Sequence, residues 1–122
     1  FTGFLSGEDV HKMFQLSDVY VMPSVSEPFG ISPLEAMRSN VPVIISKQSG
    51  VAEVLDYAVK VDYWDVDALA DAIFALIEYP ALGKMFASKG LEEVTNLKWN
   101  DAAAKIKTVY ETAIEENQKK TK

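Results

Sequence analysis

The stretch Tyr20–Glu35 reads Tyr-Val-Met-Pro-Ser-Val-Ser-Glu-Pro-Phe-Gly-Ile-Ser-Pro-Leu-Glu, and the rest of the chain is organised around it. Its apolar start predicts a strand buried on both faces, which Pro23 ends. A polar loop carrying Glu27 follows and turns through Gly30 into a helix that holds Glu35. In open α/β sheets, ligands bind beyond the carboxyl ends of strands, where helix N-termini attract anions. We therefore expect this stretch to bind a phosphate group.

Apolar runs alternate with helical patterns along the whole chain. The strands expected from the apolar runs are Phe1–Leu5, Val19–Met22, Val41–Ile45 and Ala58–Val61. The first expected helix follows the turn at residues 6–9 and carries Val10 to Leu16, and the second runs from residue 33 to 38 or 39. Further helices are expected at residues 51–55, between Asp65 or Asp67 and Pro80, and at residues 82–94 with an interruption near Gly90, and a final helix follows residue 100 or 101. This alternation predicts an α/β fold of βαβ units, with a parallel sheet and flanking helices.

Several residues have the chemistry of helix ends. Ser32-Pro-Leu-Glu35 has the pattern of a capping box, in which the serine and the glutamate each bond the other's backbone amide. Asn40 suits a left-handed position after that helix. Further caps are expected at Asp65 or Asp67, and at Asn100 or Asp101.

Length and composition limit the classes of protein that fit. The 122 residues allow one domain at most, and the net charge of −6 argues against nucleic acid or an anionic membrane as the main partner. The sequence has no cysteine and His11 is its only histidine, so we expect no disulfide and no metal site. No apolar run approaches the ~20 residues of a membrane span, and we expect a cytoplasmic location. The chain starts inside a strand-like run, so we interpret it as a piece of a longer protein.

Glu27 and Glu35 are separated by seven residues that include Pro28-Phe29-Gly30. This arrangement resembles the E-x7-E donor site of retaining glycosyltransferases of family 4 and of the related glycogen and starch synthases. The resemblance covers essentially the whole chain. Further segments match the family in the order in which they occur, namely Ser17–Val21, Leu34–Met37, Pro42–Ile44, Ser49–Val54 and the late pair Trp99 and Tyr110.

The resemblance implies the GT-B architecture, in which two Rossmann-like domains face each other across a cleft. Residues 1–122 would form part of the C-terminal, nucleotide-sugar-binding domain, without its first two strands and without the N-terminal acceptor domain. Phe1–Leu5 would then be the third strand of a sheet ordered 3-2-1-4-5-6. The absent strands would leave exposed edges that favour dimerisation or strand exchange.

By resemblance, Glu27 is the catalytic candidate. It would lie near the donor sugar, where a carboxylate accepts a hydrogen bond from a hydroxyl or stabilises the positive charge of an oxocarbenium-like transition state. Phe29 and Gly30 would turn the backbone so that its amides reach sugar hydroxyls. A solvated loop acid at Glu27, a core residue at Phe29 and a turn at Gly30 are the alternatives without a ligand.

The amides of Ile31 and Ser32 would face the diphosphate, and Glu35 would accept hydrogen bonds from the ribose 2′ and 3′ hydroxyls. The capping box offers Glu35 a purely structural task instead. Ser49 and Gly50 are expected to contact the ligand from a neighbouring loop, where the family often has two glycines and here has serine first. We assign His11 no role.

The segment from Trp99 onward resembles the part of the family that crosses back toward the N-terminal domain. Without that domain its apolar face would have no partner. The alternative is that the same stripe of residues packs on the sheet of its own domain.

The resemblance implies a transferase that moves a sugar from a UDP-, ADP- or GDP-sugar to a carbohydrate or other small acceptor, with retention of configuration and without an obligatory cofactor. The Arg and Lys pair that would neutralise the diphosphate lies outside these residues, so we expect the isolated chain to be inactive. Three alternatives stay open: a glycosidase using the carboxylate pair, a GT-B nucleotide-sugar epimerase, and a nucleotide-binding or assembly module without turnover.

Overall fold

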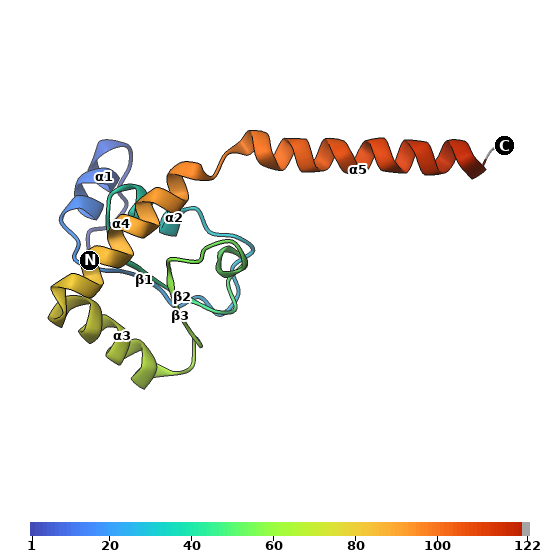
Figure 1. The fold of residues 1–122 in the computed structure, drawn as a ribbon. Helices are drawn as coiled ribbons and strands as arrows, with labels where there is room; N and C mark the ends of the chain where they lie inside the picture. Colours follow the sequence, from blue (N-terminus) through green and yellow to red (C-terminus); the bar gives the residue numbers. More distant parts are fainter. Residues whose placement is uncertain (121–122) are drawn as a thin grey trace.

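The computed structural model describes residues 1–120, which form a three-stranded sheet with helices around it (Figure 1). The elements in chain order are α1 (Glu8–Gln15), β1 (Tyr20–Met22), α2 (Ser32–Arg38), β2 (Val43–Ser46), the 3₁₀ helix η1 (Gly50–Glu53), β3 (Val59–Val61), α3 (Val66–Glu78), α4 (Pro80–Asn96) and α5 (Trp99–Lys120).

The sheet has the order β1-β2-β3, and both pairs of neighbours are parallel. Tyr20 lies beside Val43, and Ile44 lies beside Val59. Parallel neighbours need a crossover between them, which α2 supplies for the first pair and η1 for the second. The predicted α/β fold with a parallel sheet is therefore confirmed, and so is the order of these three strands.

The first predicted strand, Phe1–Leu5, is not a strand. These residues have no regular secondary structure, and Phe1 and Phe4 are exposed. A strand exists only through hydrogen bonds to a neighbour, and no described strand lies alongside these residues. Gly3 also has a φ of 70°, which breaks the extended backbone that a strand requires. The prediction that exposed sheet edges favour dimerisation stays a prediction.

The two faces of the sheet are covered by different helices. Val43 and Ile45 of β2 pack in one core with Phe14 of α1, Met37 of α2 and the end of α4. Ile44 points to the other face, where it packs with Leu76 of α3 and is joined by the start of α4. β2 is thus buried on both faces, as predicted. The residues of β1 are only partly buried, contrary to the prediction, because among the described strands β1 has β2 alone as a neighbour.

α4 is continuous, although the sequence predicts an interruption near Gly90. Gly90 is buried, and a Cβ at this position would lie 2.8 Å from Cε of Met37 in α2. The glycine therefore brings α4 close to α2 instead of ending the helix. Its cost in helix propensity, about 1 kcal/mol relative to alanine, is offset by this packing.

The helix ends agree only in part with the sequence predictions. Asp65 caps α3, its carboxylate accepting from the Ala68 amide at 2.9 Å, and Asn40 adopts the predicted positive φ, 61°. The capping box at Ser32 is absent, because no side chain caps α2. The predicted caps at Asn100 or Asp101 are wrong, because α5 already begins at Trp99 and both residues lie inside its first turn.

α5 projects from the body as a long single helix (Figure 1). It has no substantial packing contact with another described element, and its apolar side chains are exposed. The prediction that this stripe lacks a partner in the present chain is confirmed, and packing on the chain's own sheet is excluded. The exposed apolar residues are Ile106, Val109, Tyr110 and Ile114.

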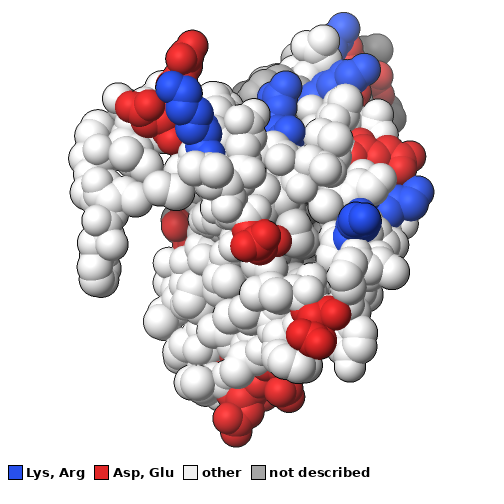
Figure 2. Space-filling view, turned by 90° about the vertical axis from the view of Figure 1, so that its left-hand side faces the viewer, with Lys and Arg blue, Asp and Glu red and all other residues white. Residues whose placement is uncertain are grey.

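Charged side chains are distributed unevenly over the face shown in Figure 2. The basic side chains lie in its upper part, among acidic ones, and the lower part carries acidic side chains in a mostly uncharged surface. Within the described residues, no helix has both the length and the hydropathy needed to cross a bilayer.

Candidate functional site

Two loops meet at the carboxyl ends of the strands. The β1–α2 loop (residues 23–31) and the β2–η1 loop (residues 47–49) are joined by a parallel bridge between Glu27 and Ser49. The Gly50 amide donates to the Glu27 carbonyl at 2.8 Å, and the Val51 amide donates to the Phe29 carbonyl at 3.1 Å. These bonds fix the backbone on which Glu27 and Phe29 stand.

A side chain of β2 also holds the β1–α2 loop. Ser46, the last residue of β2, is completely buried, and its hydroxyl donates to the Ser24 carbonyl at 2.6 Å. The end of one strand thereby holds the loop that follows its neighbour. A buried hydroxyl needs a partner, and this bond supplies one to Ser46.

Gly50, the first residue of η1, lies directly against the β1–α2 loop. A Cβ at this position would lie 1.9 Å from the Pro28 carbonyl oxygen and 2.8 Å from its carbonyl carbon. No side chain fits there, because the obstacle is backbone. The ligand contact expected at Gly50 stays a prediction, and in this structure the residue lies against the backbone of the β1–α2 loop.

Gly30 gives the loop its turn into α2. Its φ is 81°, and a Cβ would lie 3.1 Å from Cγ of Glu27 and 3.2 Å from Cε of Met22. The stem of Glu27 therefore lies against Gly30. Phe29 is 40% exposed and Ile31 is 67% exposed, so neither belongs to the core and both border the loop surface.

Tyr20 is the centre of the polar groups in this region. Its hydroxyl is 2.6 Å from the Ser32 hydroxyl, and its ring meets Phe14 edge-on with centroids 5.8 Å apart. Burial raises the pKa of Tyr20, the Ser32 hydrogen bond lowers it, and the charges of Glu35 and Glu27 raise it further. Both glutamates are therefore close enough to act electrostatically on one phenol.

Glu35 has no structural task as a cap. Its amide donates to the Ile31 carbonyl at 3.2 Å, where a capping box would have it donate to the Ser32 hydroxyl. Among the described residues, none forms a hydrogen bond with its carboxylate, which is partly exposed. Of the two interpretations that the sequence left open for Glu35, the capping box is wrong.

The structure thus brings Glu27, Gly30, Ser32 and Glu35 together around Tyr20. Ser49 lies on the other side of the Glu27 backbone and is 2% exposed, with its hydroxyl donating to the Ser46 carbonyl at 2.7 Å. The roles assigned to these residues from the sequence stay predictions.

Sequence reasoning missed Tyr20 and Ser46. The alternation of side chains along a strand could have placed Tyr20 on the face of β1 that α2 covers. No pattern in the sequence pairs its hydroxyl with that of Ser32, twelve residues later.

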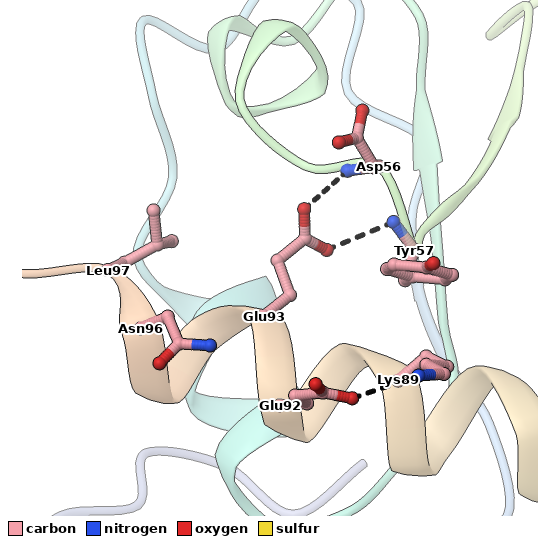
Figure 3. Close-up of a pocket in the computed structure, with 7 residues that line it drawn as sticks. All are labelled: Asp56, Tyr57, Lys89, Glu92, Glu93, Asn96 and Leu97. Carbon is pink, nitrogen blue, oxygen red and sulfur yellow. Dashed lines mark hydrogen bonds and ion pairs between the residues drawn. The ribbon is translucent and has the colours of Figure 1, made fainter.

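A pocket of about 370 Å³ lies elsewhere, between α4 and the segment before β3 (Figure 3). The Glu93 carboxylate accepts from the amides of Asp56 and Tyr57 at 2.6 and 3.0 Å, and Lys89 pairs with Glu92 at 3.0 Å. The pocket shares no residue with the two loops, and three of its four charged side chains, Lys89, Glu92 and Glu93, already bond within the protein. We therefore place the candidate site at the loops.

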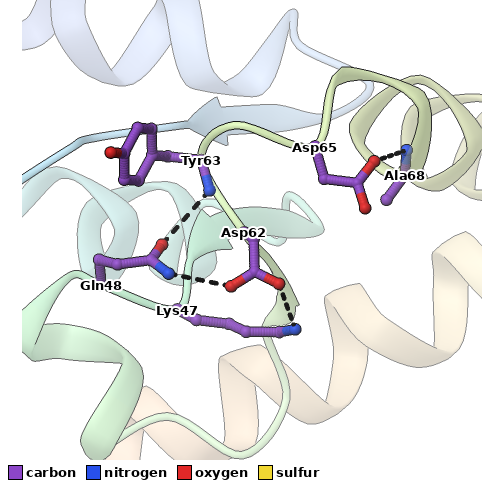
Figure 4. A network of polar contacts seen from close by, with 6 residues as sticks. All are labelled: Lys47, Gln48, Asp62, Tyr63, Asp65 and Ala68. Carbon is purple, nitrogen blue, oxygen red and sulfur yellow. Dashed lines mark hydrogen bonds and ion pairs between the residues drawn. The ribbon is translucent and has the colours of Figure 1, made fainter.

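A second polar network joins the ends of β2 and β3 (Figure 4). Asp62 accepts from Lys47 at 2.8 Å and from Gln48 at 2.9 Å, and Gln48 accepts from the Tyr63 amide at 3.3 Å. The hydrogen bonds from Lys47 and Gln48 lower the pKa of Asp62. No group of side chains suited to holding a metal ion occurs among the described residues.

The sequence model of the family "Glycosyl transferases group 1" matches residues 1–93. The chain belongs to this family. A phosphatidyl-myo-inositol mannosyltransferase of Mycobacterium leprae is 36% identical over 79% of the chain and 27% of its own length. An uncharacterized glycosyltransferase of Methanocaldococcus jannaschii is 30% identical over 94% of the chain and 30% of its own length. The chain thus spans under a third of the length of these group 1 relatives.

Solved structures of group 1 and related enzymes share the fold. A sucrose-phosphate synthase from Thermosynechococcus elongatus superposes with a TM-score of 0.76 at 30% identity, covering 94% of this chain and 30% of that one. The C-terminal domain of a glycosyl transferase group 1 family protein from Francisella tularensis gives 0.71 at 28% identity, covering 78% and 51%. The predicted fold class, that of the C-terminal domain of a GT-B glycosyltransferase, is confirmed.

Proposed function

We propose that the full-length protein transfers a sugar from a nucleotide-sugar donor to an acceptor with retention of configuration, and that this chain supplies the donor side of the cleft. One observation carries the proposal. Glu27 and Glu35 are the two ends of the E-x7-E segment, and the charges of both raise the pKa of the Tyr20 phenol. Glu27 stands on a loop whose backbone is bonded to Gly50 and Val51, and Glu35 lies in the first turn of α2. The family membership makes a transferase the first class to test.

Glu27 is proposed as the residue nearest the reacting sugar. Transfer of a glycosyl group develops positive charge at the anomeric carbon, and a carboxylate held close to it lowers the barrier. Glu27 is suited to this because its stem rests on Gly30 and its carbonyl is fixed by the Gly50 amide. A group that is already in place when charge develops needs no reorganisation.

Glu35 is proposed to bind the ribose. An ionised carboxylate can accept from two neighbouring hydroxyls, and these charge-assisted bonds are the strong ones. Its carboxylate is partly exposed and forms no hydrogen bond with the described residues. In the same proposal the backbone of Phe29 and Gly30 contacts sugar hydroxyls, the amides of Ile31 and Ser32 face the diphosphate, and Ser49 and Gly50 border the ligand.

The proposed donor is a UDP-, ADP- or GDP-sugar and the proposed acceptor is a carbohydrate or another small molecule. We propose no obligatory metal or cofactor. The relatives' names include a mannosyltransferase and a sulfoquinovosyl transferase, so the transferred sugar differs among the relatives. We therefore assign no particular sugar to this chain. The isolated 122-residue chain is expected to be inactive, and turnover by it would contradict this expectation.

The test is a screen of the full-length protein for thermal stabilisation by the three donor types, followed by calorimetry. Glu35→Gln should weaken nucleotide affinity by about 10- to 100-fold, the effect of losing hydrogen bonds to a charged group, with little change in stability. Glu27→Gln should lower kcat with nucleotide affinity retained. Glu78→Gln is the matched control, because it changes an exposed glutamate at the end of α3.

Several outcomes would contradict the proposal. Absence of binding by all three donor types would exclude it, and binding without turnover in the full-length protein would favour a nucleotide-binding module. A product with inverted anomeric configuration, observed by NMR, would contradict the proposed retention of configuration. A Glu35→Gln variant that loses stability but keeps its affinity would return this residue to a structural task.

A further inference from the structure

The sequence Ser32-x-x-Glu35 has every residue that a capping box needs, yet the box is not formed. In a box, the serine hydroxyl accepts from the Glu35 amide and the Glu35 carboxylate accepts from the Ser32 amide. Here α2 has no side-chain cap, and its N-cap residue is Ile31. The Ile31 carbonyl takes the amides of Leu34 at 2.9 Å and Glu35 at 3.2 Å. The expected local structure is replaced by another.

The reason lies in the strand beside α2. Tyr20 of β1 places its hydroxyl 2.6 Å from the Ser32 hydroxyl, a strong hydrogen bond that the two residues share. The Ser32 side chain therefore faces β1 and not the first turn of its own helix. Without the serine the glutamate has no box to complete, and its carboxylate stays free.

We propose that Tyr20 is a positioning residue of the donor site: by holding the Ser32 hydroxyl, it prevents the capping box and keeps the Glu35 carboxylate available to ligand hydroxyls. This inference rests on the proposed function of Glu35. It assigns to Tyr20 an effect on binding that is indirect, because the phenol itself need not contact the ligand.

Tyr20 is held firmly enough for this task. Its backbone is paired with β2, its amide donates to the Pro42 carbonyl at 3.0 Å, and its ring rests edge-on against Phe14. Burial and the two nearby carboxylates also raise its pKa, so the group stays a neutral phenol that can share a hydrogen with Ser32 at physiological pH.

Loss of the phenol hydroxyl would release the Ser32 side chain, and Ser32 would then replace Ile31 as the N-cap of α2 and form the capping box. The Glu35 carboxylate would then bond the Ser32 amide, and a ribose would have to compete with that bond. We expect Tyr20→Phe to weaken nucleotide affinity about fivefold, the size of a typical helix cap. The phenyl ring keeps the contact with Phe14, so stability should change little.

The experiment measures, by calorimetry on the full-length protein, the affinity for whichever of UDP, ADP and GDP binds the wild type. Tyr20→Phe should weaken it, and the double variant Tyr20→Phe/Ser32→Ala should recover the loss, because alanine cannot form the box. A merely structural role of Tyr20 would not be rescued by removing a second group. Tyr79→Phe, which removes an exposed hydroxyl elsewhere, should bind as the wild type does.

A crystal structure of the Tyr20→Phe variant without ligand gives an independent reading. It should show the Glu35 carboxylate within hydrogen-bond distance of the Ser32 amide. A carboxylate that remains unbonded there would overturn the inference.

The affinities separate failure of this inference from failure of the proposed function. Unchanged affinity in Glu35→Gln, or no binding of any diphosphate, would overturn both. Weak binding by Glu35→Gln with unchanged binding by Tyr20→Phe would overturn only the role of Tyr20. A double variant as weak as Tyr20→Phe alone would also overturn it, since the phenol would then act directly.

Discussion

Gly50 must be a glycine, because a Cβ at this position would clash with the carbonyl group of Pro28. This single residue lets the β2–η1 loop lie directly against the loop that carries Glu27. The same residue donates its amide to the Glu27 carbonyl. The sequence drew attention to Gly50 as an expected ligand contact, and only the folded chain shows that the backbone of another loop lies against it.

Replacing this glycine should be costly. Gly50→Ala is expected to lower the free energy of unfolding by about 1–3 kcal/mol or more, because the new methyl group meets rigid backbone. It should also reduce nucleotide affinity, since the Glu27 loop must move. Urea denaturation and calorimetry measure the two effects.

Gly90→Ala is the matched control, because its new methyl group would come closest to the Met37 side chain, at 2.8 Å from Cε, while the backbone oxygen of Tyr57 lies at an ordinary contact distance of 3.7 Å. The alanine gains helix propensity but disturbs the packing, and because these effects oppose each other, the free energy of unfolding should stay within about 1 kcal/mol of the wild type. Equal effects of the two substitutions would mean that the loop contact at Gly50 is unimportant.

At the scale of elements, α4 is tied to the segment before β3 by one side chain. The Glu93 carboxylate satisfies two consecutive backbone amides, at Asp56 and Tyr57 (Figure 3). These amides lie before the start of β3 and form no hydrogen bonds of the sheet. The helix thereby holds the segment before β3, although Glu93 lies 37 residues after Asp56 in the sequence.

Glu93→Ala should therefore lower the free energy of unfolding by about 1–3 kcal/mol, because two amides lose a charged acceptor. Its neighbour Glu92 pairs only with Lys89 at the surface, so Glu92→Ala should cost less than about 1 kcal/mol. Denaturation of the two variants side by side measures the difference. A larger loss of stability in Glu92→Ala than in Glu93→Ala would contradict the predicted importance of the bonds from Glu93 to the two amides.

At the scale of the whole molecule, α5 stands apart from a body that has its own core (Figure 1). A helix without tertiary contacts is only marginally stable in water, since packing of an apolar face supplies most helical stability in proteins. Its exposed stripe of Ile106, Val109, Tyr110 and Ile114 is such a face without a partner. The chain also spans under a third of its relatives' length.

We expect the amides of α5 to exchange with solvent rapidly in the 122-residue chain, whereas those of β2 exchange slowly. In the full-length protein, the α5 amides should become protected, because additional chain would cover the stripe. Hydrogen exchange followed by mass spectrometry measures both. Equal exchange of α5 in the two forms would show that the rest of the protein leaves this helix uncovered.

The sequence by itself determined the α/β class, the buried strand β2, the helices from their apolar spacing, the turns at Asn40 and Gly30, and the family. These features depend on periodicity and on local backbone preference, which are properties of neighbouring residues. Tertiary structure decided the rest. Phe1–Leu5 is no strand because a strand needs a neighbour, and α4 continues through Gly90 because Met37 packs there. The capping box at Ser32 is not formed, and the Ser32 hydroxyl shares a hydrogen bond with Tyr20 instead. Each outcome depends on a residue distant in sequence, which local patterns do not contain.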